Sequence, residues 1–325
     1  MSDTVRWGVL GAAKFAREHM APAIHAASGA KLAALATSAP EKAAPFQAFQ
    51  PDLRVHLDYD ALLNDPEIDA VYIPLPNHLH VEWALKALDA GKHVLCEKPL
   101  AMQAEQFDAV IAKRDATGLV AAEAYMIVHH PQWQKAREIY RSGALGKIWL
   151  VDGVFSYDNS GDPGNIRNRP ETGGGSIPDI GVYTFGSARF VTGEEPLAVD
   201  ARIRRENGVD VFAHVTGDFP SFRYSSITSM RMALRQEMAF HGEAGVMRLT
   251  CPFNAGVFSQ AELRLEGPGL VTETHRWPGV NHYVEQVQNF GAAVRGAAAY
   301  PCPLEFSKGT QAMIDMVWAA EQEIA

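Results

Sequence analysis

The chain has 325 residues, of which 47% are hydrophobic, and it carries a formal net charge of −9. A chain longer than ~250–300 residues usually divides into two domains, and the negative charge argues against nucleic acid or an anionic membrane as a partner. The three cysteines are too few and too scattered for a disulfide framework or a cysteine metal site. No signal peptide begins the sequence and no run approaches the ~18 apolar residues of a membrane helix, so we expect a cytoplasmic protein.

The first residues indicate a strand, a glycine turn and a helix. Residues 5–10 are mostly apolar, the residues at positions 11, 13 and 16 are small, and residues 14–27 have helical composition. This order is typical of the first unit of a dinucleotide-binding fold, where the pyrophosphate binds at the helix N-terminus, although alanines replace the second and third glycines of the usual motif. We expect the cofactor to contact Gly8, Gly11, Ala12, Ala13, Lys14 and Phe15.

The second strand, residues 31–37, indicates which dinucleotide is bound. At its end an NAD enzyme usually places an acidic residue against the ribose hydroxyls. Here Thr37 and Ser38 follow, with Lys42 a little further on, and no acid is present to repel a 2′-phosphate. We therefore expect these three residues to contact the cofactor and favour NADP, with NAD possible.

Residues 59–63 predict a short helix, residues 69–74 a strand and residues 81–90 a helix. The turn after the strand contains Pro76, Asn77 and His80, which we expect to contact the cofactor, because ligands of open α/β sheets bind at the carboxyl ends of the strands. His78 and His80 have no third ligand nearby in the sequence, so we expect no metal.

The stretch at residues 93–100, His-Val-Leu-Cys-Glu-Lys-Pro-Leu, is the centre of the first domain. A short apolar strand of this kind belongs to a parallel sheet covered on both faces. Pro99 removes a backbone donor and pushes Lys98 towards an extended conformation, so Lys98 lies at a fixed turn, where it can face a substrate. We expect Glu97 and Lys98 to contact the cofactor. A helix at 104–117 and a strand at 119–125 complete the sheet.

From residue 126 onwards the pattern changes to long β-like segments. A helix at 131–142 is followed by strands at 148–157, 197–204, 211–218, 222–230, 236–241, 245–250 and 263–265, with a helix at 180–191 among them and a last helix from 305. Hairpin turns connect several of these strands, which predicts a large open, mainly antiparallel sheet. The fold class is therefore α/β plus α+β, with a Rossmann domain at 1–125 and a substrate-binding and oligomerisation domain at 126–325.

The sequence resembles the Gfo/Idh/MocA family, the relatives of glucose-fructose oxidoreductase and inositol dehydrogenase. The resemblance covers nearly the whole chain and rests on residues 8–16, on Pro76-Asn77 with His80, on residues 90–99 and on residues 173–183, Gly-Gly-Gly-Ser-Ile-Pro-Asp-Ile-Gly-Val-Tyr. Tyr183, where many members have histidine, and residues 281–283 are similar to the subgroup of glucose-fructose oxidoreductase, dimeric dihydrodiol dehydrogenase and NADP-dependent D-xylose dehydrogenase. Val128 departs from the arginine that relatives commonly have.

The resemblance implies an assembly as well as a fold. One open face of the second sheet would form a homodimer, or a dimer of dimers, and the last helix, from about 305 to 325, would pack back on the first domain. Apolar residues at 148–151 and 230–234 exceed the number that one packed face needs, which also favours an interface. The export signal and N-terminal arm of glucose-fructose oxidoreductase are absent, so the resemblance alone does not imply its permanently bound cofactor.

The resemblance also suggests the catalytic residues. Asp179 and Tyr183 are four residues apart on one predicted helix, so their side chains share a face. A lysine ammonium near a tyrosine lowers the pKa of the phenol, so Tyr183 beside Lys98 could accept an alcohol proton near neutral pH. A helix-capping role for Asp179 and a buried structural role for Tyr183 are the alternatives. The residues expected to bind substrate are Tyr125, Asp158, Asn165, Arg167, Arg169 and His282.

We therefore expect an NADP-preferring oxidoreductase that acts on a sugar or polyol hydroxyl, with an aldose at its anomeric carbon as the first choice, or that runs in reverse as a carbonyl reductase. Two alternatives stay open. One is a non-catalytic NADP-binding sensor, which would need neither Lys98 nor Tyr183. The other is an enzyme that retains its cofactor and exchanges hydride between two sugars or oxidises a hydroxyl transiently for elimination.

Overall fold

The structure is a computed structural model that describes residues 4–324. These residues form two compact units, one of residues up to 129 together with 281–308, the other of residues 130–280 together with 309 onwards. The first unit therefore takes in a late segment that we expected in the second domain. That segment is held by packing, because Phe290 lies against Trp7 of the first strand with ring centroids 5.0 Å apart, and by Arg114, which pairs with Glu305 at 2.7 Å.

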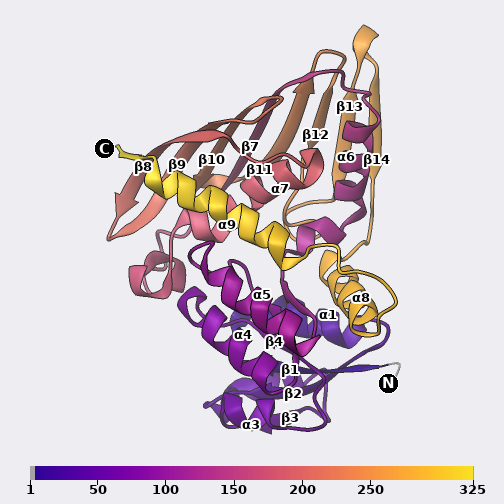
Figure 1. Ribbon diagram of the computed structural model, residues 1–325, viewed down its shortest axis with the longest axis vertical. Coiled ribbons are helices and arrows are strands. Elements are labelled where there is room, and N and C mark those ends of the chain that lie inside the picture. Colours follow the sequence, from indigo (N-terminus) through magenta and orange to yellow (C-terminus); the bar gives the residue numbers. More distant parts are fainter. Residues whose placement is uncertain (1–3, 325) are drawn as a thin grey trace. The chain divides into compact units, whose positions relative to one another are not determined.

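The described part of the first unit contains a six-stranded parallel sheet (Figure 1). Its strands are β1 (Val5–Leu10), β2 (Ala30–Ala36), β3 (Arg54–His56), β4 (Ala70–Ile73), β5 (His93–Cys96) and β6 (Ala121–Glu123), and their order is β3-β2-β1-β4-β5-β6. Because all strands are parallel, their carboxyl ends meet at one edge. The chain changes direction across the sheet between β1 and β4, the place where α/β folds bind ligands.

The helices of the first unit cover this sheet. They are α1 (Ala21–Ala26), which continues a π-helical segment Ala16–Met20, α2 (Ala44–Gln47), α3 (Tyr59–Leu63), α4 (His80–Asp89), α5 (Gln106–Thr117), α8 (His282–Val294) and the first turns of α9 (Leu304–Ala319). Local signals set several ends. Asp58 caps α3 by accepting from the Ala61 N–H at 2.6 Å, and Gly118, with a φ of 66°, ends α5.

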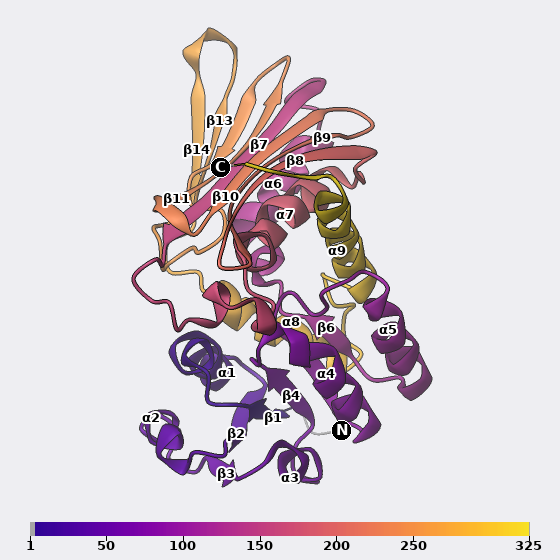
Figure 2. The same cartoon turned by 90° about the vertical axis from the view of Figure 1, so that its left-hand side faces the viewer.

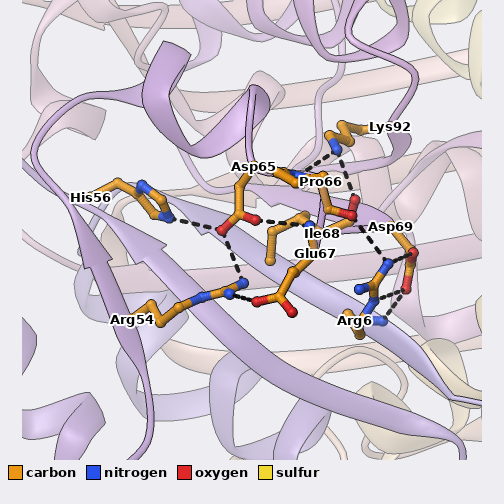
Figure 3. Close-up of polar contacts among 9 residues, drawn as sticks. All are labelled: Arg6, Arg54, His56, Asp65, Pro66, Glu67, Ile68, Asp69 and Lys92. Atoms are coloured by element: carbon orange, nitrogen blue, oxygen red, sulfur yellow. Dashed lines mark hydrogen bonds and ion pairs between the residues drawn. The ribbon is translucent and has the colours of Figure 1, made fainter.

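The loop between α3 and β4 is fixed by basic side chains (Figure 3). Arg6 of β1 holds the Asp69 carboxylate with two bonds, Nε to Oδ2 at 2.9 Å and Nη2 to Oδ1 at 2.6 Å. Lys92, which is buried, donates from Nζ to the backbone carbonyls of Asp65 and Ile68 at 2.7 and 2.8 Å. The two Nζ contacts give carbonyls of this loop a donor from outside the loop and tie it to the residue before β5.

The second unit contains, in its described part, a nine-stranded sheet. Its strands are β7 (Ile148–Asp158), β8 (Ala198–Glu206), β9 (Val209–Asp218), β10 (Arg223–Ser229), β11 (Arg231–Gly242), β12 (Val246–Leu249), β13 (Glu262–Glu266), β14 (Thr272–Arg276) and β15 (Glu321–Glu323), in the order β14-β13-β12-β11-β7-β10-β9-β8-β15. The pairs β7–β10 and β8–β15 are parallel and the other pairs antiparallel. The predicted fold class, α/β plus α+β with a mainly antiparallel second sheet, is therefore confirmed.

Helices α6 (Pro131–Arg141) and α7 (Val182–Thr192) lie along the same face of this sheet (Figure 2). A π-helical segment, Ile177–Gly181, leads directly into α7, whose residues 182–191 are all buried. Aromatic side chains join the layers, as where Phe155 of β7 lies against Tyr183 of α7 with ring centroids 5.8 Å apart. The sheet therefore packs against α7 and restricts the rotation of the helix about its axis.

Three strands differ from the prediction. We expected no strands at β3, β14 and β15, and we expected the last helix to reach the end of the chain, whereas α9 ends at Ala319. β14 reads Thr-Glu-Thr-His-Arg and β15 reads Glu-Gln-Glu, so neither has the apolar residues that identify a strand. They are ordered by pairing with β13 and β8, a contact between distant parts of the sequence.

Among the described residues no helix is both long and apolar enough to cross a membrane. Within residues 4–324, no group of three or more His, Cys, Asp or Glu side chains is placed to hold a metal ion.

Candidate active site

The turn after β1 has room only for small residues. Gly11 has a φ of +107°, and a Cβ built there would lie 3.2 Å from Leu75 Cδ2 and 3.3 Å from the Tyr59 hydroxyl oxygen. The Gly11 N–H donates to Ala36 O at 2.9 Å, which fixes the turn against β2. The following Ala12 and Ala13 are only partly buried, and the helix begins directly after them. This cradle fits a dinucleotide, whose phosphates need close approach to backbone N–H groups.

Two of the residues predicted to contact the cofactor here also have packing roles. Gly8 is buried within β1, and a Cβ on it would lie 2.6 Å from Leu62 Cδ2, so its missing side chain lets α3 approach the sheet. The ring of Phe15 lies 5.7 Å from that of Tyr283 and 4.9 Å from that of His19. Lys14, by contrast, is exposed.

The three residues at the end of β2 that we expect to contact a 2′-phosphate differ in exposure and in hydrogen bonding. The Thr37 hydroxyl is buried and accepts from the Ala39 N–H at 3.2 Å, so it shapes the turn. Ser38 and Lys42 are exposed just beyond it. The two exposed side chains can therefore reach a phosphate without breaking a contact within the protein.

His80 lies at the start of α4, beside the turn with Asn77 as the sequence placed it, and has a structural role there. It is fully buried, and its Nδ1 and Nε2 lie 2.8 and 2.7 Å from the carbonyl oxygens of Pro99 and Leu75. Burial lowers the pKa of His80 to about 4. The histidine thus ties the turn after β4 to the turn after β5, whereas Pro76 and Asn77 in the same turn stay partly exposed to a ligand.

Glu97 and Lys98 follow β5 at the same edge of the sheet. Tyr72 of β4 donates its hydroxyl to Glu97 Oε1 at 2.6 Å, and burial raises the pKa of Tyr72. Burial also raises the pKa of Glu97, while the bond from Tyr72 and the charge of Lys98 oppose that effect. Lys98 is partly buried and precedes a cis peptide bond to Pro99. Glu97 is therefore fixed by its neighbours, and the lysine follows it at a rigid turn.

Two residues expected to bind substrate are buried in the first unit. Tyr125 is 1% exposed and lies 6.1 Å from the ring of Phe306, and His282 is fully buried at the start of α8, with its ring 4.3 Å from that of Tyr283. Both pack within the unit, which gives them a structural role beside any contact with substrate.

In the second unit Asp179 is fixed by two partners. Its Oδ2 accepts from the Tyr157 hydroxyl at 2.7 Å and pairs with Arg167 Nε at 2.8 Å. Asp179 raises the pKa of Arg167, and burial raises the pKa of Tyr157. Arg167, which we expected to bind substrate, lies against the predicted catalytic aspartate, and its contact with substrate stays a prediction.

Tyr183 lies one helical turn after Asp179 and is 5% exposed. Its ring packs against those of Phe155 and Phe253, with centroids 5.8 and 5.7 Å away. The phenol is therefore placed by packing against these aromatic rings. Its part in proton transfer stays a prediction.

The loop after β7 contains the other predicted substrate contacts, and their described bonds are local. Asp158 accepts from the Ser160 N–H at 2.9 Å, Asn165 Oδ1 accepts from the Arg167 N–H at 3.1 Å, and Arg169 pairs with Glu171 at 2.7 Å. Asp158 and Arg169 are exposed and Asn165 is partly buried. These three side chains shape the loop, and contact with a substrate stays a prediction.

Sequence reasoning missed three polar residues, Tyr72, Tyr157 and Asp210. Each lies within a strand and bonds a motif residue distant in the sequence, and Asp210 accepts from the Ser176 hydroxyl at 2.7 Å. A single polar residue in an apolar strand was the available signal for Asp210, which interrupts Val209 and Val211. The tyrosines gave no signal, because tyrosine is common in strands.

The fold and these residues define an NAD(P)-dependent oxidoreductase of sugars. The description of an oxidoreductase family with an NAD-binding Rossmann fold matches residues 5–125, and that of the GFO/IDH/MocA C-terminal domain matches residues 133–248. The chain belongs to the GFO/IDH/MocA family, which confirms the resemblance drawn from the sequence, and its first domain is NAD(P)-binding.

Three proteins illustrate the relationship. The chain is 32% identical to a dTDP-3,4-didehydro-2,6-dideoxy-alpha-D-glucose 3-reductase of Saccharopolyspora spinosa, covering 99% of this chain and 97% of the relative. It is 30% identical to a D-xylose 1-dehydrogenase (NADP(+)) of Haloferax volcanii, covering 97% of each. The crystal structure of KijD10, a 3-ketoreductase from Actinomadura kijaniata in complex with NADP and TDP-benzene, matches with a TM-score of 0.90 at 28% identity over 99% of both chains.

Proposed function

We propose that the protein exchanges hydride between NADP and a sugar, with oxidation of an aldose at its anomeric carbon as the first candidate. The observation that carries this proposal is the helix on which Tyr183 follows Asp179 by one turn, with Asp179 fixed by Tyr157 and Arg167. Such a pair can bind a sugar hydroxyl and take up its proton. The relationship to a D-xylose 1-dehydrogenase over 97% of both chains supports the choice of substrate.

Each of these residues has a separate role in the proposed reaction. When bound, NADP supplies the hydride acceptor. The C–H bond at the substrate carbon breaks, the hydroxyl proton passes to the phenolate oxygen of Tyr183, and a carbonyl forms. Lys98 supplies a cation that favours the phenolate, and Asp179 accepts a hydrogen bond from a second hydroxyl and orients the sugar. The reverse direction uses Tyr183 as the acid.

The preference for NADP rests on the end of β2. Ser38 and Lys42 are exposed there, and no acidic side chain stands at the position that contacts the ribose in NAD enzymes. A hydroxyl and an ammonium favour a 2′-phosphate. We therefore propose that catalytic efficiency with NADP exceeds that with NAD.

A second candidate is the reduction of a keto group on a sugar carried by a nucleotide. It is favoured by the relationship to a dTDP-sugar 3-reductase over 99% of this chain and by the match to a 3-ketoreductase with a TM-score of 0.90. The same residues serve this reaction in reverse, with Tyr183 donating the proton to the new alkoxide.

One assay separates these candidates. The purified protein is incubated with a panel of aldoses, inositols and small diols plus NADP⁺ or NAD⁺, and separately with keto sugars, free and nucleotide-linked, plus NADPH, while the absorbance of the reduced nicotinamide is followed. Oxidation of aldoses supports the first candidate, and consumption of NADPH only with keto sugars supports the second. A protein that binds NADP and turns over nothing would be a sensor. Cofactor that survives gel filtration, with no net reduction of added NADP⁺, would indicate exchange between two sugars.

We also propose that two copies associate through the second sheet. Leu234 and Met232, 57% and 37% exposed, lie near the start of β11, and Trp149 of β7, 56% exposed, lies at the other end of the same strand pair. Large apolar side chains exposed on one sheet favour an interface. Light scattering at micromolar concentration tests this, and a monomeric mass would contradict it.

A further inference from the structure

A buried carboxylate holds the start of the helix that carries Asp179 and Tyr183. Asp210 of β9 is 1% exposed, and its Oδ2 accepts from the Ser176 hydroxyl and from the Ile177 N–H, both at 2.7 Å. The Ser176 hydroxyl in turn lies 3.0 Å from the hydroxyl of Thr228 on β10. The first N–H groups of a helix have no partner within the helix, so this contact joins the helix to the sheet at its first turn.

The glycine before the helix leaves room for the Asp210 carboxylate. Gly175 has a φ of +127°, and a Cβ built on it would lie 1.9 Å from Asp210 Oδ1, so any side chain there would push the carboxylate away. Asp179 lies one helical turn after Gly175, and its backbone N–H donates to Gly175 O at 3.3 Å. The helix runs on through Gly181 to Tyr183 without a break. The position of both catalytic candidates along and around the helix axis therefore depends on the anchor at its first turn.

The charges around Asp210 are few. Arg205 stands opposite it on β8 and attracts the carboxylate, but Arg205 is also bound to Glu321 of β15 at 2.6 Å, while the groups of β10 and of the helix start are hydroxyls and an N–H. Burial raises the pKa of Asp210 to about 7, although the bonds from Ser176 and Ile177 and the charge of Arg205 lower it. The carboxyl therefore changes its protonation in the neutral range, and the ionised form is the stronger acceptor.

We propose that Asp210 is a positioning residue for the reaction, which holds Asp179 and Tyr183 in place through Ser176 and the Ile177 N–H. This inference rests on the proposed function. Loss of the anchor lets the first turn of the helix shift, and a displacement of ~1 Å at a reacting group can lower turnover on the order of 10²-fold.

Two variants on the same strand test the proposal. Asp210→Asn keeps the shape of the side chain and removes its charge, whereas Asp218→Asn makes the same change at a half-exposed residue of β9 that pairs with Arg223. We expect Asp210→Asn to lower kcat about 10- to 100-fold with the affinity for NADPH, measured by fluorescence titration, unchanged, and Asp218→Asn to behave as the wild type. Ser176→Ala, which keeps the carboxylate and removes one donor, should lower kcat by a smaller factor.

Two further measurements separate positioning from general loss of structure. In the wild type, kcat should rise more between pH 6 and pH 8 than in Asp210→Asn, because only the wild type gains a carboxylate in this range. Amide hydrogen exchange in a peptide covering 175–183 should be faster in Asp210→Asn than in Asp218→Asn, with peptides of the first unit unaffected.

The proposal is overturned if Asp210→Asn matches Asp218→Asn in kcat and in exchange. If Asp210→Asn does not fold, Ser176→Ala decides by the same two measurements. If the wild type acts on no sugar, the proposed function is wrong, and the exchange experiment alone shows whether Asp210 anchors the helix.

Discussion

The two units position their candidate functional residues by different means. In the first unit the ligand-binding edge consists mainly of backbone at the carboxyl ends of parallel strands, shaped by Gly11 and by turns that His80 joins through two carbonyls. In the second unit the site consists of side chains fixed to one another, with Asp179 held by Tyr157 and Arg167. A backbone cradle can bind the same group in many relatives, whereas a side-chain cluster can change with the substrate. The difference indicates that cofactor binding and turnover can be disrupted separately.

The sharpest test of this separation is Tyr183→Phe. The change keeps the ring that packs on Phe155 and removes the hydroxyl, so turnover should fall on the order of 10²–10⁴-fold, the usual contribution of a positioned acid–base residue. The affinity for NADPH should stay the same. Steady-state kinetics measure turnover and fluorescence titration measures the affinity for NADPH, with Tyr140→Phe as the matched control. Near-normal turnover would mean that the proton passes to another group.

Lys98→Met tests the one side chain of the first unit to which we assign a part in the chemistry. The methionine keeps much of the length of the lysine side chain and removes its charge, so turnover should fall on the order of 10²-fold. The residual activity should rise at a pH above the wild-type optimum, because a phenol without a nearby cation ionises only at higher pH. The double variant with Tyr183→Phe should be little worse than either single one. Lys113→Met is the control, and full additivity would show that the two residues act independently.

Gly11→Ala tests the backbone cradle. An alanine with a φ of +107° is strained by ~1–3 kcal/mol, and its Cβ would approach Leu75 and Tyr59, so the Kd for NADPH should rise about tenfold. The value of kcat at saturating cofactor should fall much less. A loss confined to kcat would contradict the division between the two units.

Ser38→Asp changes the choice of cofactor and leaves the chemistry alone. The carboxylate repels a 2′-phosphate and can accept from ribose hydroxyls, so the ratio of kcat/KM for NADP to that for NAD should reverse. Ser38→Ala separates the charge from the loss of the hydroxyl. Equal efficiencies in the wild type would show that the end of β2 does not select the cofactor.

Lys92→Met should affect stability without affecting either function. The variant removes the Nζ donor from the carbonyls of Asp65 and Ile68. The Asp65 carbonyl keeps the Ile68 N–H at 3.2 Å, and the loss of the donor to a buried carbonyl costs ~1–3 kcal/mol. The midpoint of thermal unfolding should fall by a few degrees with kcat and the Kd for NADPH unchanged, whereas Lys31→Met, at an exposed position, should have no effect. Altered kinetics in Lys92→Met would mean that the loop before β4 is coupled to the site.

The same comparison explains what the sequence could predict. The first unit was largely predictable because its ligand-binding turns are contiguous: residues 8–16, the turn after β4 and residues 93–100 each follow an apolar strand. In the second unit β7 to β13 and the helix with Asp179 and Tyr183 were predictable from local pattern, and so was the mainly antiparallel sheet, whereas β14 and β15 were not.

The rest depends on the order of strands in space. Tyr157 meets Asp179, and Asp210 meets Ser176, only because β7, β10 and β9 are neighbours in the sheet, and this order is not written in any local pattern. His80 has a structural role that the sequence did not reveal. Its place beside a ligand-binding turn suggested a contact with the cofactor, which stays a prediction, and its burial against two carbonyls also makes it part of the scaffold.

The return of residues 281–308 to the first unit has a consequence for synthesis on the ribosome. Trp7 is fully buried and lies against Phe290 of α8, so the nascent first unit has an incomplete core until α8 has emerged, long after β1 to β6 have been made. The second unit has by then been synthesised almost entirely between the two parts. Although N-terminal domains generally fold first during synthesis, here the N-terminal unit is completed only near the end of translation, and its unpaired apolar surface would be available to chaperones in the meantime.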